Sequence, residues 1–120
     1  MAVVLVVDDD DPIRALVTRI LQRDAHTVVT ARHGAEAIGL LANRDFDLMV
    51  LDVMMPIANA FDVLAFMRDR GPWTQTIILT AAHDAQLTTL NTENVCAIVH
   101  KPFDIEALQT LVRSCVAPLS

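Results

Sequence analysis

Four short apolar runs in the chain are each followed by polar side chains whose types suit phosphoryl transfer. The polar endings are Asp8-Asp9, Asp52, Thr80 and Lys101. A carboxylate that attacks a phosphoryl group approaches three negative oxygens, so a divalent cation and an ammonium group are needed to neutralise the charge. The acids could bind that cation, and Lys101 could supply the ammonium. The sequence therefore predicts a phosphoryl-transfer site, provided that the fold brings the four endings together.

The acidic endings also suit a metal ion. Asp8-Asp9 and Asp52 repel one another if they meet, and crowded carboxylates are relieved by protonation or by a divalent cation. Hard oxygen ligands that leave positions open for water favour Mg²⁺. The next two acids are interpreted as a solvated turn, with Asp11 as the N-cap of the following helix and Pro12 at its first position. We therefore expect Mg²⁺ at the first pair and Asp52, with Asp10 and Asp11 outside the site.

The apolar runs before these endings predict parallel β-strands. Continuous apolar runs separated by helical patterns are typical of strands buried on both faces of a sheet. Such runs occupy residues 3–7, 48–51, 77–79 and 97–99, and a β-branched run at 26–30 adds a fifth strand. In an open α/β sheet the ligand lies beyond the carboxyl ends of the strands. The polar endings are therefore expected to meet at one edge of the sheet.

Helical periodicity fills the intervals between these strands. Apolar residues repeat at helical spacing over residues 13–21, 35–42, 61–67, 84–90 and 104–115, and the fourth stretch has the weakest apolar face. The alternation predicts an α/β fold: a doubly wound (βα)5, five-stranded parallel sheet, flavodoxin-like, in the order 2-1-3-4-5 with helices on both faces. In that order the first and third strands are neighbours. One domain over residues 1–120 is expected, because no linker or repeat interrupts the pattern.

Composition and charge narrow the class of protein further. The chain has 120 residues, 53% of them hydrophobic, and 15 acidic against 9 basic residues give a net charge of −6. Direct binding of nucleic acid is not expected, because it needs a basic patch. No apolar stretch approaches the roughly 18 residues of a membrane helix, and no basic leader precedes the first strand. No membrane contact and a cytoplasmic location are therefore expected.

The cysteines and histidines give no sign of a second site. Cys96 and Cys115 have neither CxxC spacing nor a histidine at metal-ligand distance, so they are predicted to be reduced packing thiols. The histidines at positions 26, 33, 83 and 100 lack ligand spacing and are interpreted as surface or packing residues.

Four motifs together resemble a known family. They are Val6-Val7-Asp8-Asp9 with Arg14 five residues after the second acid, Leu51-Asp52-Val53-Met54-Met55-Pro56, Leu79-Thr80-Ala81, and Lys101-Pro102-Phe103. In this order, and across essentially the whole chain, they resemble the receiver domain of two-component response regulators, of the chemotaxis-regulator type. Each motif is weak alone, whereas the combination is highly specific.

The resemblance implies a role for each of these residues. Asp52 would be the phosphoacceptor, with Asp9 as a direct Mg²⁺ ligand, Asp8 holding the metal mostly through water, and the Met54 backbone carbonyl as a further ligand. Thr80 would be the switch hydroxyl and Lys101 the phosphate-binding cation, often preceding a cis peptide bond to proline. The partners would be a histidine kinase or a histidine phosphotransfer protein, and an unidentified output domain or effector. Such a domain catalyses its own phosphorylation and slow dephosphorylation and is not a metabolic enzyme.

Two departures from the family pattern leave an alternative open. Asn59-Ala60 stands where Asp-Gly is usual, so that the turn is either strained or rebuilt, and Ile98 replaces an aromatic switch residue. A receiver-like module that binds partners without phosphorylation is the alternative. A phosphohydrolase of the haloacid-dehalogenase type is disfavoured, because Met54 stands where a second aspartate is needed. A flavin or nucleotide site lacks its glycine-rich loop.

Overall fold

A computed structural model describes residues 2–52, 57–70, 74–80 and 95–116 of the chain. The elements, in chain order, are β1 (Val3–Val7), α1 (Asp11–Arg23), β2 (Thr27–Ala31), α2 (Gly34–Asn43), β3 (Leu48–Asp52), α3 (Ile57–Arg70), β4 (Gln75–Thr80), β5 (Val95–His100) and α5 (Ile105–Val116). The helix predicted at 84–90 lies outside the described residues. No helix within the described ranges is both long and apolar enough to cross a bilayer.

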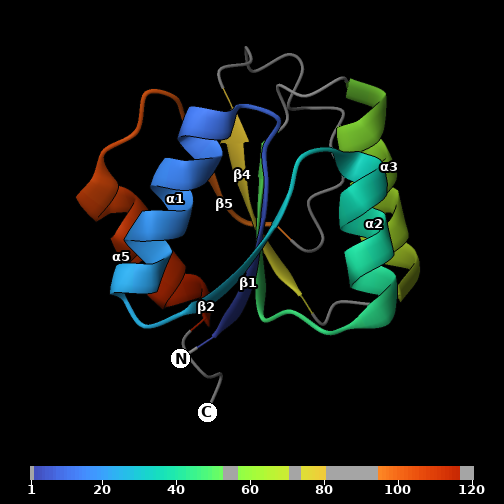
Figure 1. Cartoon of the computed structure of the whole chain (residues 1–120), viewed down its shortest axis with the longest axis horizontal. Coiled ribbons are helices and arrows are strands. Elements are labelled where there is room, and N and C mark those ends of the chain that lie inside the picture. The colour runs from blue at the N-terminus through green and yellow to red at the C-terminus, as the bar shows by residue number, and fades with distance from the viewer. Residues whose placement is uncertain (1, 53–56, 71–73, 81–94, 117–120) are drawn as a thin grey trace.

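The strands form one parallel sheet in the order β2-β1-β3-β4-β5. This order confirms the predicted flavodoxin-like topology. Helices α1 and α5 cover one face of the sheet, and α2 and α3 cover the other (Figure 1). The strands point in one direction, so their carboxyl ends share one edge, where β1 ends at Val7 beside Leu51 of β3.

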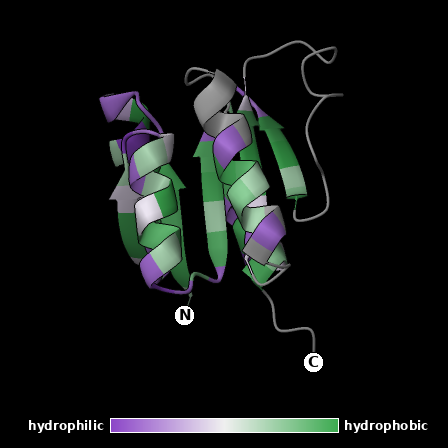
Figure 2. Cartoon of the chain, turned by 90° about the vertical axis from the view of Figure 1, so that its right-hand side faces the viewer, coloured by the Kyte–Doolittle hydropathy of each residue, from purple (hydrophilic) through white to green (hydrophobic). Residues whose placement is uncertain are grey.

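The core consists of two apolar layers, one on each face of the sheet. On the α1 and α5 side, strand residues such as Val4, Val6 and Val50 pack with Val17 and Leu108. The opposite layer contains the alternate strand residues and the buried faces of α2 and α3. Figure 2 shows the strands as mostly hydrophobic and the helices as mixed. Burial of both strand faces explains why these sequences are apolar without alternation.

Helix α1 begins one residue earlier in the acidic run than predicted. Asp10 is the N-cap, because its backbone is extended and its side chain accepts a hydrogen bond from the Ile13 N–H at 3.1 Å. Asp11, predicted to be the N-cap, is instead the first helical residue and forms an ion pair with Arg14. Both residues are aspartates and can cap a helix equally well, so the sequence did not show which of them is the N-cap.

The end of α1 has a left-handed residue that is not glycine. Ala25 has φ of 66° and donates its N–H to the Gln22 carbonyl at 3.0 Å. The His26 N–H bonds back to Leu21 at 3.2 Å. These bonds satisfy carbonyls of the last helical turn, as glycine usually allows at this place.

The two cysteines form a disulfide, so the prediction of reduced packing thiols is wrong. Cys96 of β5 is bonded to Cys115 of α5, with Cα atoms 6.0 Å apart. Helix α5 packs back along β5 and thereby brings together two residues that lie 19 apart in sequence. The spacing of the two cysteines in the sequence did not reveal the disulfide, because they come together only when α5 packs against β5.

Helix α3 decides between the two interpretations of Asn59-Ala60. Both residues lie inside α3, which begins at Ile57. The described residues contain only one non-glycine positive φ, at Ala25. The segment is therefore rebuilt as helix rather than strained, and alanine suits a helix well.

Candidate functional site

The ends of four neighbouring strands position the predicted polar residues. Asp8 follows β1, Asp52 ends β3, Thr80 ends β4, and Lys101 follows β5. Pairing of Val7 with Leu51 places the two acidic ends side by side. The Lys101 N–H donates to the Thr80 carbonyl at 2.8 Å, which extends the pairing of β4 and β5 by one residue.

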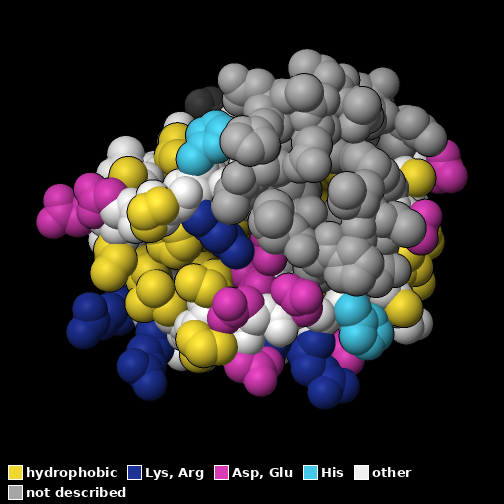
Figure 3. Space-filling view, turned by 90° about the horizontal axis from the view of Figure 1, so that it is seen from above, with side chains coloured by type: hydrophobic (Ala, Val, Ile, Leu, Met, Phe, Trp, Pro, Cys, Tyr) yellow, Lys and Arg dark blue, Asp and Glu magenta, His cyan; other side chains and the backbone are white. Residues whose placement is uncertain are grey.

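Three carboxylates meet at this edge, as the sequence predicts. One oxygen from each of Asp8, Asp9 and Asp52 lies within 4.8 Å of the others. Asp8 and Asp52 are 1% exposed, and Asp9 is exposed. Seen from above the sheet edge, acidic side chains gather beside a basic one, with an apolar area adjoining them (Figure 3). Such crowding of buried carboxylates requires compensation by positive charge or protons.

Lys101 supplies positive charge to both buried acids. Its Nζ lies 3.3 Å from Oδ2 of Asp52 and 3.6 Å from Oδ2 of Asp8. The lysine side chain is only 18% exposed, so solvent screens these contacts less than it would at the surface. The peptide bond from Lys101 to Pro102 is cis, as the resemblance implied.

Burial dominates the protonation of Asp8. Poor solvation of the charged form, together with the neighbouring Asp52 carboxylate, raises the pKa of the Asp8 carboxyl from its ordinary 3.8 to about 6. The Asp10 N–H, 2.9 Å from Oδ1 of Asp8, and the Lys101 ammonium act in the opposite direction. The folded chain therefore disfavours full ionisation of this carboxylate cluster.

The donor set fits a hard divalent cation. Oδ2 of Asp8 is buried and has no hydrogen-bond donor among the described residues, since the Lys101 ammonium at 3.6 Å is beyond hydrogen-bond distance. A buried carboxylate oxygen without a donor is costly unless a cation approaches it. Three carboxylates within reach of one ion, one of them exposed, are ligands that Mg²⁺ accepts together with water. Met54 lies outside the described residues.

Arg14 stabilises the turn between β1 and α1, a role that the sequence analysis did not predict. Its guanidinium donates to the backbone carbonyl of Asp8 at 2.9 Å and pairs with the Asp11 carboxylate. The side chain is 17% exposed. An arginine one turn inside a helix that follows an acidic strand end was the available signal, because its side chain points back toward the helix N-terminus.

Thr80 and Ile98 are the two residues of β4 and β5 that the family pattern associates with switching. Thr80 is fully buried at the end of β4, beside His100 in the strand pairing. Ile98 is 38% exposed on β5, so the position that carries an aromatic residue in the family pattern presents an aliphatic side chain here.

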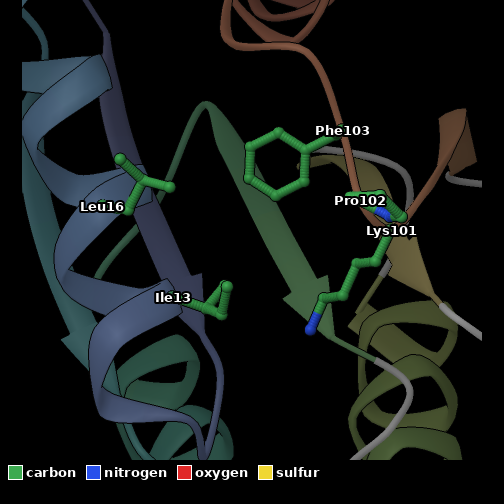
Figure 4. A pocket seen from close by; sticks show the side chains of 5 residues that line it. All are labelled: Ile13, Leu16, Lys101, Pro102 and Phe103. Carbon is green, nitrogen blue, oxygen red and sulfur yellow. The ribbon is translucent and has the colours of Figure 1, made fainter.

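A shallow apolar pocket adjoins Lys101. Its volume is about 420 Å³, and Ile13, Leu16, Pro102 and Phe103 line it with Lys101. Figure 4 shows Ile13 and Leu16 on α1 opposite Phe103, with the lysine chain extending below the phenyl ring toward the end of β3. The acidic cluster therefore has an apolar surface next to its cation.

Comparison with known proteins identifies this arrangement. The model of the response regulator receiver domain family matches residues 4–113. The transcriptional regulatory protein TcrA of Mycobacterium tuberculosis is 40% identical over 78 residues, which are 65% of this chain and 31% of that protein. The response regulator MprA of a Mycobacterium species is 33% identical over 112 residues, which are 92% of this chain and 49% of that protein. The chain thus spans half the length of these relatives or less.

A solved structure matches the whole fold. The response regulator protein TrrA of Thermotoga maritima, in complex with Mg²⁺-BeF, superposes with a TM-score of 0.84 at 30% identity. The match covers 96% of this chain and 99% of that one.

Proposed function

The chain belongs to the response regulator receiver domain family of two-component systems, and from this membership we propose that Asp52 accepts a phosphoryl group from a phosphohistidine. The donor is a histidine kinase or a histidine phosphotransfer protein. Asp8, Asp9, Asp52 and the Met54 carbonyl hold Mg²⁺, and Lys101 and Thr80 contact the phosphoryl group. The domain comprises residues 1–120, and its role is signalling rather than metabolic turnover.

One observation carries this proposal. The Lys101 ammonium lies within 3.6 Å of two buried carboxylates that belong to neighbouring strand ends. A lysine that only neutralised a surface acid would gain little, because exposed ion pairs contribute about 0–1 kcal/mol. A cation held at a buried acidic cluster suits a site where additional negative charge must be accommodated. The TrrA complex with Mg²⁺-BeF supports the same assignment by homology.

The chemistry follows from the charges of the chain's own residues. An oxygen of the Asp52 carboxylate forms a bond to phosphorus while the bond from phosphorus to the donor imidazole nitrogen breaks, and its electron pair returns to that ring. The Asp52 carboxylate loses its negative charge in the acyl phosphate, the departing ring takes up a proton and leaves as neutral imidazole, and the Lys101 ammonium pairs with the phosphoryl oxygens. The Thr80 hydroxyl, at the end of the adjacent strand, donates to a phosphoryl oxygen. Bound Mg²⁺ supplies further charge neutralisation.

The carboxylate chemistry is tested with a small-molecule donor. Incubation with acetyl phosphate and Mg²⁺ should add one phosphoryl group, measured by intact mass, and Asp52→Asn should abolish it. Asp69→Asn is a matched control, because Asp69 is an exposed acid outside the cluster. Labelling of the Asp52→Asn protein, or labelling that EDTA does not prevent, would contradict the proposal. Absence of labelling in the wild type would instead favour a module that works without phosphorylation.

The response to the signal is expected from a domain or protein other than this receiver domain. TcrA is a transcriptional regulatory protein, and this chain matches only 31% of it. We propose that this acidic domain passes the signal to an output domain or effector and does not itself bind nucleic acid.

A further inference from the structure

The disulfide occupies an irregularity of the sheet. Thr76 pairs with Val95 and Ile77 pairs with Ala97, so β5 has one residue more than β4 at this point. That extra residue is Cys96. A bulge of this kind re-aims a side chain and is a local feature of the strand rather than a packing defect. Here the residue at the bulge is the one that bonds Cys115 of α5.

The bond lies at the opposite end of the sheet from the acidic cluster. Cys96 is near the start of β5, whereas Lys101 follows its end. Helix α5 runs back along the sheet, so that its last turn lies at the end of the sheet where β1 begins (Figure 1). Cys96 is exposed and Cys115 is partly buried. The exposed side of the bond is therefore the one at Cys96, from which an external thiol would approach the folded chain.

The last turn of α5 depends on this bond more than the rest of the helix does. Leu108 and Val112 are fully buried and hold the preceding turns against the core. Beyond them, Arg113 contacts Asp24 at 3.2 Å through a side chain that is 64% exposed. An ion pair in which one partner is so exposed is a weak anchor. Val116 also packs against the core, and the disulfide of Cys115 is the covalent attachment of residues 113–116 to the sheet.

We propose that Cys96 and Cys115 are a reversible thiol–disulfide site that controls the attachment of the last turn of α5. A dithiol reductant attacks the Cys96 sulfur, and the Cys115 sulfur leaves as a thiolate and takes up a proton. The second thiol of the reductant then displaces Cys96, so the chain gains two thiols and the reductant becomes a disulfide. Oxidation by a disulfide of suitable potential reverses both steps. Exposed disulfides are generally more easily reduced than buried structural ones, and labile disulfides are the regulatory or catalytic ones.

The chemical test uses the folded wild-type protein. The protein is equilibrated at neutral pH, without denaturant, in mixtures of reduced and oxidised dithiothreitol, and free thiols are counted by mass after alkylation. Both thiols should appear together in one two-electron transition. The reduced protein should melt about 10 °C lower, given the 19-residue separation that the bond closes. Two free thiols under oxidising conditions, or a bond that opens only in denaturant, would overturn the proposal.

The structural consequence is tested by amide hydrogen exchange. Reduction should accelerate exchange at residues 113–116, while β1 and the turn around Leu108 keep their protection. The Cys96→Ser/Cys115→Ser variant should exchange like reduced wild type and should not respond to dithiothreitol. Equal exchange of residues 113–116 in the two redox states would refute the control of this turn. Phosphorylation of Asp52 is not used as a readout, so the outcome is independent of the proposed function.

Discussion

At the scale of single residues, burial and charge conflict at Asp8. Its pKa is raised to about 6 from 3.8, so the folded chain holds this proton more tightly than the unfolded chain does. Its contribution to stability is therefore greatest when it is protonated and is lost as the pH rises from about 4 through about 6. An aspartate stabilised by a salt bridge shows the opposite pH dependence, because its contribution to stability is lost as the pH falls.

Asp8→Asn should accordingly stabilise the metal-free protein at pH 7, by on the order of 1 kcal/mol, because loss of the Lys101 contact offsets part of the gain. Asparagine keeps an oxygen for the Asp10 N–H and removes the charge. The gain should vanish near pH 4, where the wild-type carboxyl is protonated. Thermal melts in EDTA across this pH range measure the effect. A gain that does not change with pH would show that charge is not its cause.

Mg²⁺ should stabilise the wild type more than Asp8→Asn. The wild type should gain about 2.7 kcal/mol at a Mg²⁺ concentration of 100 times its Kd, whereas Asp8→Asn should gain much less. Melts with and without Mg²⁺ on the same two proteins test it. If Mg²⁺ leaves the wild-type melting temperature unchanged, the site does not bind this metal.

Two buried threonines on either side of Gln75 offer a contrast in hydrogen bonding. Thr76 is fully buried, and its hydroxyl has no partner among the described residues, whereas the Thr74 hydroxyl donates to the Phe46 carbonyl at 2.8 Å. Thr76→Val should stabilise the protein by about 1 kcal/mol, because it removes an unsatisfied polar group. Thr74→Val should destabilise it by about 1–3 kcal/mol, because the carbonyl loses its donor. Urea unfolding of both variants would contradict this account if they changed stability in the same direction.

At the scale of elements, helix ends show most clearly what sequence patterns can and cannot predict. The helical periodicity predicted α1 and α5, and the apolar runs predicted their neighbouring strands. The N-cap was misplaced by one residue, because Asp10 and Asp11 differ in backbone conformation rather than in type. The left-handed residue after α1 carried no signal, because Ala25 is not a glycine.

Ala25→Gly should stabilise the end of α1. Glycine reaches positive φ without the steric penalty of a Cβ, which is worth about 1 kcal/mol before its greater chain entropy is counted. A net gain of about 0.5 kcal/mol is expected in denaturant unfolding. Ala15→Gly, at an exposed position inside α1, is the matched control and should lose about 1 kcal/mol. Destabilisation by both substitutions would argue against the left-handed conformation.

At the scale of the whole molecule, sheet topology made the convergence of these polar side chains predictable. Once Asp8, Asp52 and Lys101 were assigned to the ends of parallel strands, a shared edge followed from the direction of the strands. The disulfide was not predictable in this way, because a bulge at Cys96 changes no hydrophobic pattern. The hydrogen bond from Arg14 to the Asp8 carbonyl was also missed, because the sequence shows the spacing of Arg14 from the acids but not the backbone carbonyl that its side chain reaches.

The central claim is that Asp52, rather than another acid of the cluster, receives the phosphoryl group. The most direct test labels the protein with acetyl phosphate and Mg²⁺, reduces the acyl phosphate with borohydride, and locates the resulting homoserine by peptide mass spectrometry. Homoserine should replace Asp52 alone and should be absent when EDTA is added before labelling. Homoserine at Asp8 or Asp9, or at no position in labelled protein, would contradict the assignment.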